Sequence, residues 1–598
     1  MMSALRFTVC KIPSCSSWLN PSAIRSPHFF NGRQSKKLGR ARKKEDHVES
    51  ANLYQVGMRF PRISCLAIAC AWLTCTMSAV AQHEQHEHPA GEPEKLGKVN
   101  FPVSCDAAVQ LQFNRAVAML HSFWYEKANE EFAAIAKKDP ACGMAYWGIA
   151  MALYHPIWEA PGPAALRQGS EAVAKARLAA PKTQRERDYI AAIETFYKDF
   201  DNLDHHTRAL AYEKAMEQLQ ARYPDDREAA IFYALALQGS ASPTDKTYAN
   251  QRKAGALLEK ILADQPDHPG VAHYIIHAYD YPPLAARALD AARSYAKIAP
   301  DSPHALHMPS HIFTRLGLWQ ESIGSNLASE AAAEKYNAPG NELHAQDYLV
   351  YAYLQGAQDH AAKKVMDAAP APLPDDPQYF NGLYATGTMA PRYAVERHQW
   401  KDAAALTVPP NIFPGGRYAW AEANIHFART LGASHIGDID SAKKELQQLE
   451  SLRDTLIKVN EKYWADQVDI QREIATAWLT LAERKNEEAL RQMRHAVDHE
   501  DSTDKHPVTP GMILPARELL GEMLLELKQP AQALAEFEGT LRTAPNRYNA
   551  LSGAARAAKL SGDSEKAKSY YAKLLVICDH ADGDRPELRD ARALLARK

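Results

Sequence analysis

The sequence has few cysteines and none of the short motifs that mark common catalytic sites. Only 8 of its 598 residues are cysteine. It contains no G-x-S-x-G, G-x-x-x-x-G-K-S/T, G-x-G-x-x-G, H-E-x-x-H or C-x-x-C. These absences leave serine, cysteine, nucleotide and zinc-protease chemistry without support. The 46% hydrophobic and 24% charged content excludes collagen, disorder throughout and a polytopic membrane protein, so we expect a globular chain with a sizeable core.

A long apolar run is lacking too, since the uncharged stretch at residues 63–77 is short for a membrane span. It follows Arg59 and Arg62 and precedes the small residues 79–81. This order of charged, apolar and small residues is that of a secretory signal peptide, with cleavage after Ala81. We therefore expect an exported protein, periplasmic or secreted, with no integral membrane span after signal cleavage.

Basic residues are concentrated at the N-terminus. Residues 1–81 carry 12 Lys and Arg against 3 Asp and Glu, which leaves 58 basic against 69 acidic residues in the rest of the chain. The net charge of that rest is therefore −11. Because nucleic acids and anionic membranes need a basic surface, we expect neither as a partner.

Three cysteines remain after cleavage, and an oxidising compartment favours disulfides. Cys105 opens the first helical segment, and Cys142 lies just before the segment that should stack beside it in parallel. We predict a Cys105–Cys142 disulfide and a lone Cys578. Three buried thiols are the alternative, because connectivity does not follow from sequence alone.

From residue 102 onward the apolar residues recur at helical spacing, as in Val109, Phe113, Ala116, Val117 and Leu120. Helix stops containing glycine separate segments of about a dozen residues. No stretch alternates with a period of two. The sequence therefore predicts an all-α protein.

A period of 34 residues runs through these segments. A small residue, a larger one four positions later and a proline eight positions after that occur four times: Ala128, Phe132, Pro140; Ala254, Leu258, Pro266; Ala288, Ala292, Pro300; and Ala533, Phe537, Pro545. This A-x3-F-x7-P core resembles the tetratricopeptide repeat, a helix-turn-helix unit. As a whole the chain is similar to exported bacterial tetratricopeptide-repeat proteins with His-rich helices. The resemblance implies a tetratricopeptide-repeat superhelix, an α-solenoid of antiparallel helix pairs, of the kind that mainly serves as an interaction scaffold.

The expected organisation follows from these signals and from Pro-rich breaks near 370 and 410. Met58 is the expected start, because an export signal normally begins at the N-terminus. The predicted parts are a non-native or disordered basic leader (1–57), the signal peptide (58–81), a His-rich polar linker (82–99), an N-terminal repeat array with a His-rich groove (100–370), a degenerate helical-repeat segment (371–505) and a C-terminal repeat pair (506–598).

Histidine is the most informative residue type, because six of the 24 fall between positions 268 and 311. His273 and His277 lie seven and eleven residues after Pro266, and His307 and His311 repeat that phase after the next proline of the period. A four-residue spacing stacks side chains on one helix face, and the next repeat places its pair on a neighbouring helix about 8–10 Å away. The four imidazoles should therefore converge, and in the repeat family their stripe lines the concave groove.

Neighbouring residues extend this predicted site. Asp280 and His304 lie near the two pairs, and His344 and Asp347 lie three apart on the next inner helix, where either could ligate a metal or orient a ligand. Pro309 should kink the helix between His307 and His311. Four further residues occupy or flank the same stripe in the first repeats and would form an apolar end of the groove, although core packing is the more common role of such aromatics: Phe113, Trp147, Met151 and His155.

Three interpretations of the cluster stay open. The histidines could bind a transition metal, since imidazole suits Zn, Cu, Fe and Ni. They could line a metal-free groove that binds an acidic peptide or a small anion. They could also be structural, donating to backbone carbonyls between packed helices. A second His-containing stretch predicts a solvated turn, with a cation site as the alternative: His495 and His499, followed by Glu500, Asp501, Asp504 and His506.

We therefore expect a binding scaffold that holds a peptide, protein or small-molecule ligand in its concave groove, with a transition metal at the His cluster. The alternative is a metallo-enzyme in which the same cluster keeps an open metal position and Asp280, Asp347 or His304 acts as general base. A closed four-histidine site would leave no room for substrate, which favours binding over catalysis.

Overall fold

Helices make up the regular structure of the chain. The computed structural model describes residues 94–374, 376 and 379–596, which belong to one compact unit, Ala90–Lys598. These residues form α-helices α1 to α26 and three short 3-10 helices, and no strand occurs among them. The predicted leader, the signal peptide and most of the polar linker lie outside the described residues.

The N-terminal array runs from η1 to α15. Its elements are η1 (Ala107–Val109), α1 (Gln110–His121), α2 (Tyr125–Lys138), α3 (Gly143–Ala152), α4 (Pro163–Leu178), α5 (Gln184–Tyr197), α6 (His205–Arg222), α7 (Arg227–Gly239), α8 (Ala249–Asp264), α9 (Pro269–Tyr279), η2 (Ala285–Ala288), α10 (Leu289–Ile298), α11 (Pro303–His307), α12 (Pro309–Leu316), α13 (Trp319–Lys335), α14 (Pro339–Gln355) and α15 (Asp359–Ala368).

The C-terminal helices continue the array. They are α16 (Tyr379–Val395), α17 (Trp400–Ala404), η3 (Gly416–Tyr418), α18 (Ala419–Ile436), α19 (Ile439–Lys458), α20 (Lys462–Ala482), α21 (Asn486–Ser502), α22 (Ala516–Glu526), α23 (Pro530–Thr543), α24 (Tyr548–Leu560), α25 (Ser564–Ile577) and α26 (Pro586–Leu595).

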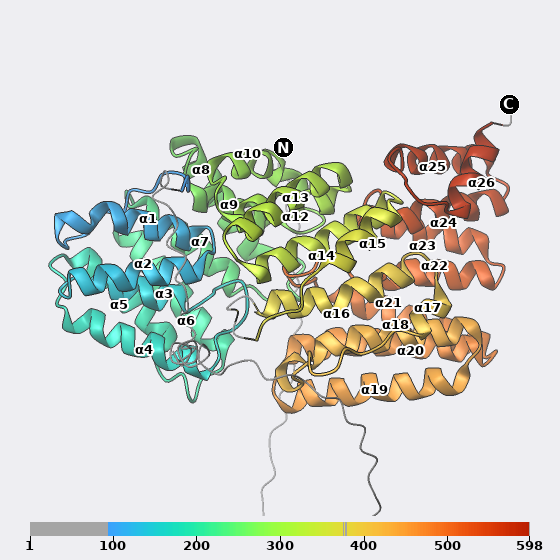
Figure 1. Ribbon diagram of the computed structural model, residues 1–598, viewed down its shortest axis with the longest axis horizontal. Coiled ribbons are helices and arrows are strands. Elements are labelled where there is room, and N and C mark those ends of the chain that lie inside the picture. Colours follow the sequence, from blue (N-terminus) through green and yellow to red (C-terminus); the bar gives the residue numbers. More distant parts are fainter. Residues whose placement is uncertain (1–93, 375, 377–378, 597–598) are drawn as a thin grey trace, which may run out of the picture. The chain divides into compact units, whose positions relative to one another are not determined.

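Consecutive helices pack side by side as antiparallel pairs, and each pair packs on the next (Figure 1). The repeat residues explain this packing, since Ala128, Phe132, Ala533 and Phe537 are all fully buried. A Cβ on Gly148 of α3 would lie 2.3 Å from the Phe132 ring, so only glycine lets α2 and α3 approach this closely. The chain is an all-α helical-repeat protein of the tetratricopeptide type.

The inner helices of the first half turn back toward each other. Helix α1 packs against α9, although seven helices, α2 to α8, separate them along the chain. A Cβ on Gly270 would lie 2.6 Å from His121 Nδ1, so the start of α9 touches the end of α1. The inner faces of these helices are therefore packed against each other.

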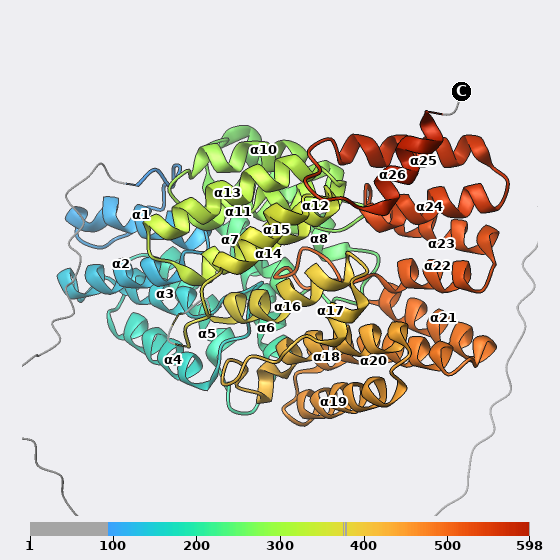
Figure 2. The same cartoon turned by 45° about the vertical axis from the view of Figure 1, so that its right-hand side comes forward.

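The helix that carries the second histidine pair is broken, as the proline predicts. It divides into α11 and α12 at Met308, and Pro309 is the first residue of α12, where its missing N–H costs no helical hydrogen bond. Neighbouring helices hold both pieces, since α11 and α12 both pack against α13. In Figure 2, α13 and α14 lie beside them.

The predicted seam near 370 falls in the non-helical stretch between α15 and α16. The predicted seam near 505 falls in the connection between α21 and α22, residues 503–515, which we call the crossing segment. It is not a linker between separate parts: Lys505 binds Asp280 at 3.0 Å, and the carbonyl oxygen of Thr509 accepts from Tyr348 at 3.1 Å. The crossing segment therefore reaches the N-terminal array.

The end of the predicted polar linker is also packed. Leu96 is buried, the Lys95 amide donates to Asp301 at 2.8 Å, and the Lys98 amide donates to the carbonyl oxygen of Asp267 at 3.0 Å. The expectation of a flexible segment up to residue 99 is therefore wrong for residues 94–99. One apolar side chain and two acceptors at the loops before α9 and α11 are enough to fix this stretch.

Cys105 and Cys142 form a disulfide, with their Cα atoms 4.8 Å apart. It ties the residues just before η1 to the start of α3. Cys578 is a free thiol, buried after α25. Among the described residues, none of the helices has the length and apolar character needed to cross a membrane.

Candidate metal centre

Four inner helices bring six histidines together. Helix α9 supplies His273 and His277, α11 supplies His304 and His307, α12 supplies His311 and α14 supplies His344. The rings lie close to one another: the centroids of His273 and His304 are 5.0 Å apart, and those of His307 and His344 are 4.2 Å apart. All four predicted ligands and two of the possible additional ones, His304 and His344, thus belong to one cluster.

The cluster is not on an open groove, which corrects the sequence prediction. Each of the six histidines is at most 6% exposed. The reason is the contact of α1 with α9, which places Phe123 over the first rings: its ring stacks on His277 at 5.4 Å and meets His273 edge-on at 4.4 Å. The stripe that lines a groove in an open solenoid is buried here.

The histidines divide into two sets of three. The first set is His273, His277 and His304, and the second set is His307, His311 and His344. Within each set, the candidate ligand nitrogens all lie within 4.8 Å of one another. Each set combines a four-residue pair with one histidine from the next inner helix.

Most of the Nε2 atoms of the cluster lack a hydrogen-bond partner among the described residues. Those of the whole first set and of His344 are buried and have no hydrogen-bond partner among the described residues. Leaving a buried polar atom unsatisfied costs about 1–3 kcal/mol. Four such atoms in one cluster are therefore not explained by packing.

In two of the histidines, one from each set, an acceptor holds Nδ1. His273 Nδ1 lies 2.6 Å from the carbonyl oxygen of His121, and His307 Nδ1 lies 2.7 Å from Asn326 Oδ1. An amide or carbonyl oxygen accepts only from a protonated nitrogen, so Nδ1 donates and Nε2 keeps its lone pair. This is how proteins orient imidazole for a metal ion.

In the second set, the Nε2 atoms of His307 and His311 are 3.1 Å apart. His311 Nδ1 donates to Asp280 Oδ2 at 3.0 Å, which leaves its Nε2 as a lone pair as well. A tetrahedral ion with bonds of about 2.0–2.1 Å holds neighbouring nitrogens about 3.3 Å apart. The two lone pairs therefore converge at a separation that suits a shared cation.

Asp280 belongs to neither set of three and contacts the cluster through His311 Nδ1. Its carboxylate binds Arg315 Nε at 2.8 Å and Lys505 Nζ at 3.0 Å in addition to His311. Lys505 and Arg315 together hold the pKa of Asp280 well below its usual range despite its burial. Asp280 is thus an ionised orienting group, while burial lowers the pKa of Lys505 to about 8.

Burial also fixes the charge state of the imidazoles. It holds the pKa values of His273, His277, His304, His307 and His344 well below 6.5, and the nearby histidines lower them further. The rings are therefore neutral at pH 7, which is the form that binds metals.

Asp347 does not join the cluster, although it lies on the same helix as His344. It accepts from Thr388 at 2.9 Å and lies 3.8 Å from Arg392 Nε. Burial raises its pKa to about 6. As a residue three positions after His344, it points toward α16 instead of the imidazoles.

Tyr348 and the crossing segment cover the second set. The Tyr348 hydroxyl lies 3.4 Å from His311 Nε2 and donates to the carbonyl oxygens of Pro507 and Thr509 at 3.3 and 3.1 Å. The predicted solvated turn is therefore wrong from residue 503 on, where Thr503, Val508 and Thr509 are buried. Of the charges in this stretch, Lys505 binds Asp280 and Asp504 pairs with Lys246, both at 3.0 Å.

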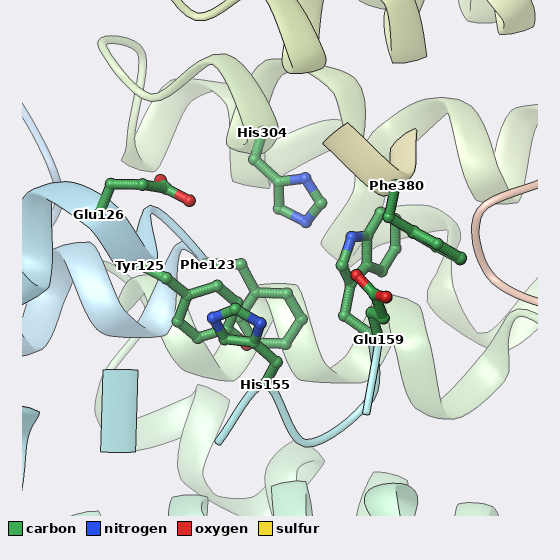
Figure 3. Close-up of a pocket in the computed structure, with 8 residues that line it drawn as sticks. Phe123, Tyr125, Glu126, His155, Glu159, His304 and Phe380 are labelled. Carbon is green, nitrogen blue, oxygen red and sulfur yellow. The ribbon is translucent and has the colours of Figure 1, made fainter. Parts of the chain in front are cut away.

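A pocket opens onto the first set. Its cavity volume is about 20 Å³, room for a water-sized molecule, and it is lined by Phe123, Tyr125, Glu126, His155, Trp158, Glu159, His304 and Phe380. Figure 3 shows the His304 imidazole pointing into the space between Glu126, the Tyr125 and Phe123 rings, and Phe380. Of the residues predicted to line a groove, His155 lies here, stacked on Tyr125 at 4.3 Å.

The other predicted groove residues are core residues. Phe113, Trp147 and Met151 are at most 1% exposed and belong to the core of the N-terminal array. Phe101 contacts both Phe113 and Trp147, with ring centroids 5.5 and 5.4 Å away. The closing of α1 onto α9 turns the expected groove wall into a helix interface.

Sequence reasoning missed a second group of buried histidines. His121 Nε2 and His268 Nε2 each lie 2.9 Å from one oxygen of Glu228, and His121 Nδ1 lies 3.0 Å from the Tyr274 hydroxyl. The two histidines hold the pKa of Glu228 below its usual value despite its burial. No spacing links His121 of α1 to Glu228 of α7, so no periodic signal could have revealed this triad.

Comparison with known proteins adds little to this description. Neither a protein-family profile nor a curated protein matches the sequence. Among solved structures, the chain is similar to a human IFIT1 dimer with m7Gppp-AAAA, at 12% identity over 73% of this chain and 90% of that chain, with a TM-score of 0.32. A monomeric mutant of IFIT1 with Gppp-AAAA gives 11% identity over 72% and 90%, also at 0.32. The Naa15/Naa10 complex bound to HypK-THB gives 12% identity over 81% and 73%, at 0.22. Likenesses of this strength do not bear on what this chain binds.

Proposed function

We propose that this chain is an exported helical-repeat protein that holds a transition metal in its buried histidine cluster and admits a small ligand through the pocket at His304. The observation that carries the proposal is the group of four buried Nε2 atoms without a hydrogen-bond partner among the described residues. A metal of the kind that imidazole prefers, Zn, Cu, Fe or Ni, satisfies these atoms. Neither a metal-free groove nor structural histidines would leave them unsatisfied.

The pocket favours a small molecule over a peptide. Its cavity volume of about 20 Å³ holds only a very small ligand, and its walls are mainly aromatic. A peptide or protein partner elsewhere on the repeat surface stays a prediction from the resemblance, because scaffolding is what such repeats mainly do.

Elemental analysis of the chain purified from its native host tests the proposal. We expect stoichiometric metal in the wild type and none in a His273→Ala/His307→Ala variant, which removes one ligand from each set. The matched control is His206→Ala/His495→Ala, because both of these histidines are exposed. Metal that persists in the first variant would place the site elsewhere, and a metal-free wild type would overturn the proposal.

Export rests on the signal-like order before Ala81 and is supported by the Cys105–Cys142 disulfide, since disulfides persist in oxidising compartments. N-terminal sequencing of the protein from its native host should begin at Gln82. A chain that retains Met58 contradicts cleavage. Non-reducing peptide mapping should recover Cys105 joined to Cys142, with Cys578 as the free thiol.

A metallo-enzyme is the second candidate, and the pocket is the observation that favours it. A ligand in the pocket would meet His304 and the carboxylate of Glu159, whose pKa is raised by burial. Glu159 is better placed than Asp280, which is occupied by Arg315 and Lys505. Azide added to the cobalt-loaded chain should shift its visible absorption if a coordination position is open, whereas an unchanged spectrum indicates a closed, non-catalytic site.

A further inference from the structure

We propose that the cluster holds two copper ions, one in each three-histidine set, and that only the ion of the first set is open to an exogenous ligand. This inference rests on the proposed function, because it assigns the number, identity and accessibility of the metal at the same site. It uses the division into two sets, the charges around them and the different cover over each set.

The number of ions follows from the length of the bond between a metal ion and an imidazole nitrogen. Bonds from a metal to imidazole are about 2.0–2.1 Å long, so the nitrogens bound to one ion lie within about 4.2 Å of each other. The six histidines meet a comparable limit only within each set of three. One ion therefore uses only half of the cluster, and two ions use all of it.

Charge and ligand type select the metal. Neither set includes a carboxylate, and the carboxylate that orients His311, Asp280, already faces the two cations Arg315 and Lys505. Two buried dications would therefore add a large uncompensated charge, which is costly in a protein interior. Copper(I) halves that charge, and copper is among the metals that imidazole suits. Three neutral imidazoles are a sufficient ligand set for copper(I).

The two sets differ in cover. His304 of the first set lines the pocket, so an ion bound there lies beside a space that a very small ligand can enter. The second set lies under Tyr348, whose ring centroid is 4.6 Å from that of His307 and whose hydroxyl is tied to the crossing segment. A small ligand that enters the pocket therefore reaches the first ion and not the second.

Copper(I) reconstitution of the full mature chain tests the proposal. The metal-free protein is dialysed with copper(I) under anaerobic conditions, passed over a chelating resin and analysed for copper per chain. We expect two copper ions in the wild type and in the His495→Ala control. We expect one in His273→Gln, one in His344→Gln and none in the double variant, and circular dichroism of each metal-free variant checks the helical fold.

Carbon monoxide then reports accessibility, because it binds copper(I) and gives an infrared band for each accessible site. We expect one band in the wild type, the same band in His344→Gln and none in His273→Gln. Two bands in the wild type, or a band that survives only in His273→Gln, contradict the different cover of the two sets.

The possible failures are distinct. One copper per chain in the wild type, lost in either single variant, overturns the pair of ions but leaves a metal-binding protein. Retention of two zinc ions in competition with copper(I) overturns the identity of the metal. A wild-type chain that holds no metal at all overturns the proposed function itself. The wild-type stoichiometry decides the number of ions even if a variant fails to fold.

Discussion

Two groups of buried histidines lie within the same helical array, and they differ in what their ring nitrogens face. His121 and His268 each present Nε2 to one oxygen of Glu228, so a carboxylate holds one nitrogen of each ring, and His268 Nδ1 is the one ring nitrogen of this pair left without a partner among the described residues. The first set presents three buried Nε2 atoms that no described residue satisfies. The shared burial shows that a histidine inside a repeat array is not by itself a sign of a site. Several buried nitrogens without a partner, gathered within ligand distance of one another, are such a sign.

The largest expected effect is the dependence of the free energy of unfolding on pH, which differs between the two groups of histidines. The pKa values of His273, His277, His304, His307 and His344 are held well below 6.5 in the folded, metal-free chain, and unfolding returns them to about 6.5. Below that pH the unfolded chain binds more protons, so the free energy of unfolding falls as the pH falls, by about 1.4 kcal/mol per pH unit for each histidine.

Urea titrations of the metal-free chain at pH 7.5, 6.5 and 5.5 measure this loss. The contributions of several histidines together should cancel the free energy of unfolding of a typical protein, ~5–15 kcal/mol, within about two pH units. The lowered pKa of Glu228 has a different window, because its contribution is present above about 4.5 and is lost only as the pH falls below that value. A stability that is constant between pH 7.5 and 5.5 contradicts the neutral, buried state of the cluster.

Metal removal is expected to have the next largest effect and to act on one group alone. A metal present at about 1,000 times its dissociation constant stabilises the folded state by about 4 kcal/mol. Chelator should therefore lower the melting temperature of the wild-type chain but not that of His277→Ala/His311→Ala. An equal shift of the melting temperature in the two proteins would contradict both the metal-binding and the metallo-enzyme proposals.

Glu228→Gln is the converse experiment. It leaves two buried imidazoles without their shared carboxylate, and breaking a buried pair of this kind costs about 3–5 kcal/mol. We expect thermal unfolding to report a loss near the lower end, about 3 kcal/mol, with the metal content unchanged. Loss of metal in Glu228→Gln would show that the two groups are not independent, through the His121 carbonyl oxygen that accepts from His273.

Asn326→Ala tests the smallest expected effect. It removes the acceptor of His307 Nδ1 while leaving all six imidazoles in place. Loss of such an orienting partner typically lowers metal affinity about 10–100-fold. Competition with a chromogenic chelator measures the change, and Asn424→Ala, a buried asparagine far along the chain, is the control. An unchanged affinity would remove Asn326 from the support of the second set.

The repeat spacing was enough to predict the helical pairs and the convergence of His273, His277, His307 and His311, because a 34-residue translation fixes which helix faces align. It could not predict that the pairs divide into separate sets. That division depends on His304 and His344, which lie outside the repeated phase and come from the next inner helix in each case.

The burial of the site was also beyond the sequence. It results from the curvature that brings α1 onto α9 and from the crossing segment, and neither leaves a periodic trace. Phe113, Trp147 and Met151 show the same limit. Their helical phase predicts an inner face, but whether an inner face meets ligand or another helix depends on contacts between distant repeats.

The crossing segment also sets the order in which the centre can be assembled. Lys505 and Asp280 are separated by 225 residues, and Tyr348 and Thr509 by 161. Contacts between such distant residues close large loops and form slowly. A growing chain that ends before Thr503 already carries all six histidines, yet the second set is still uncovered. Completion of the centre is therefore tied to the arrival of the last hundred residues, and an incomplete chain presents its histidines to any metal in its surroundings.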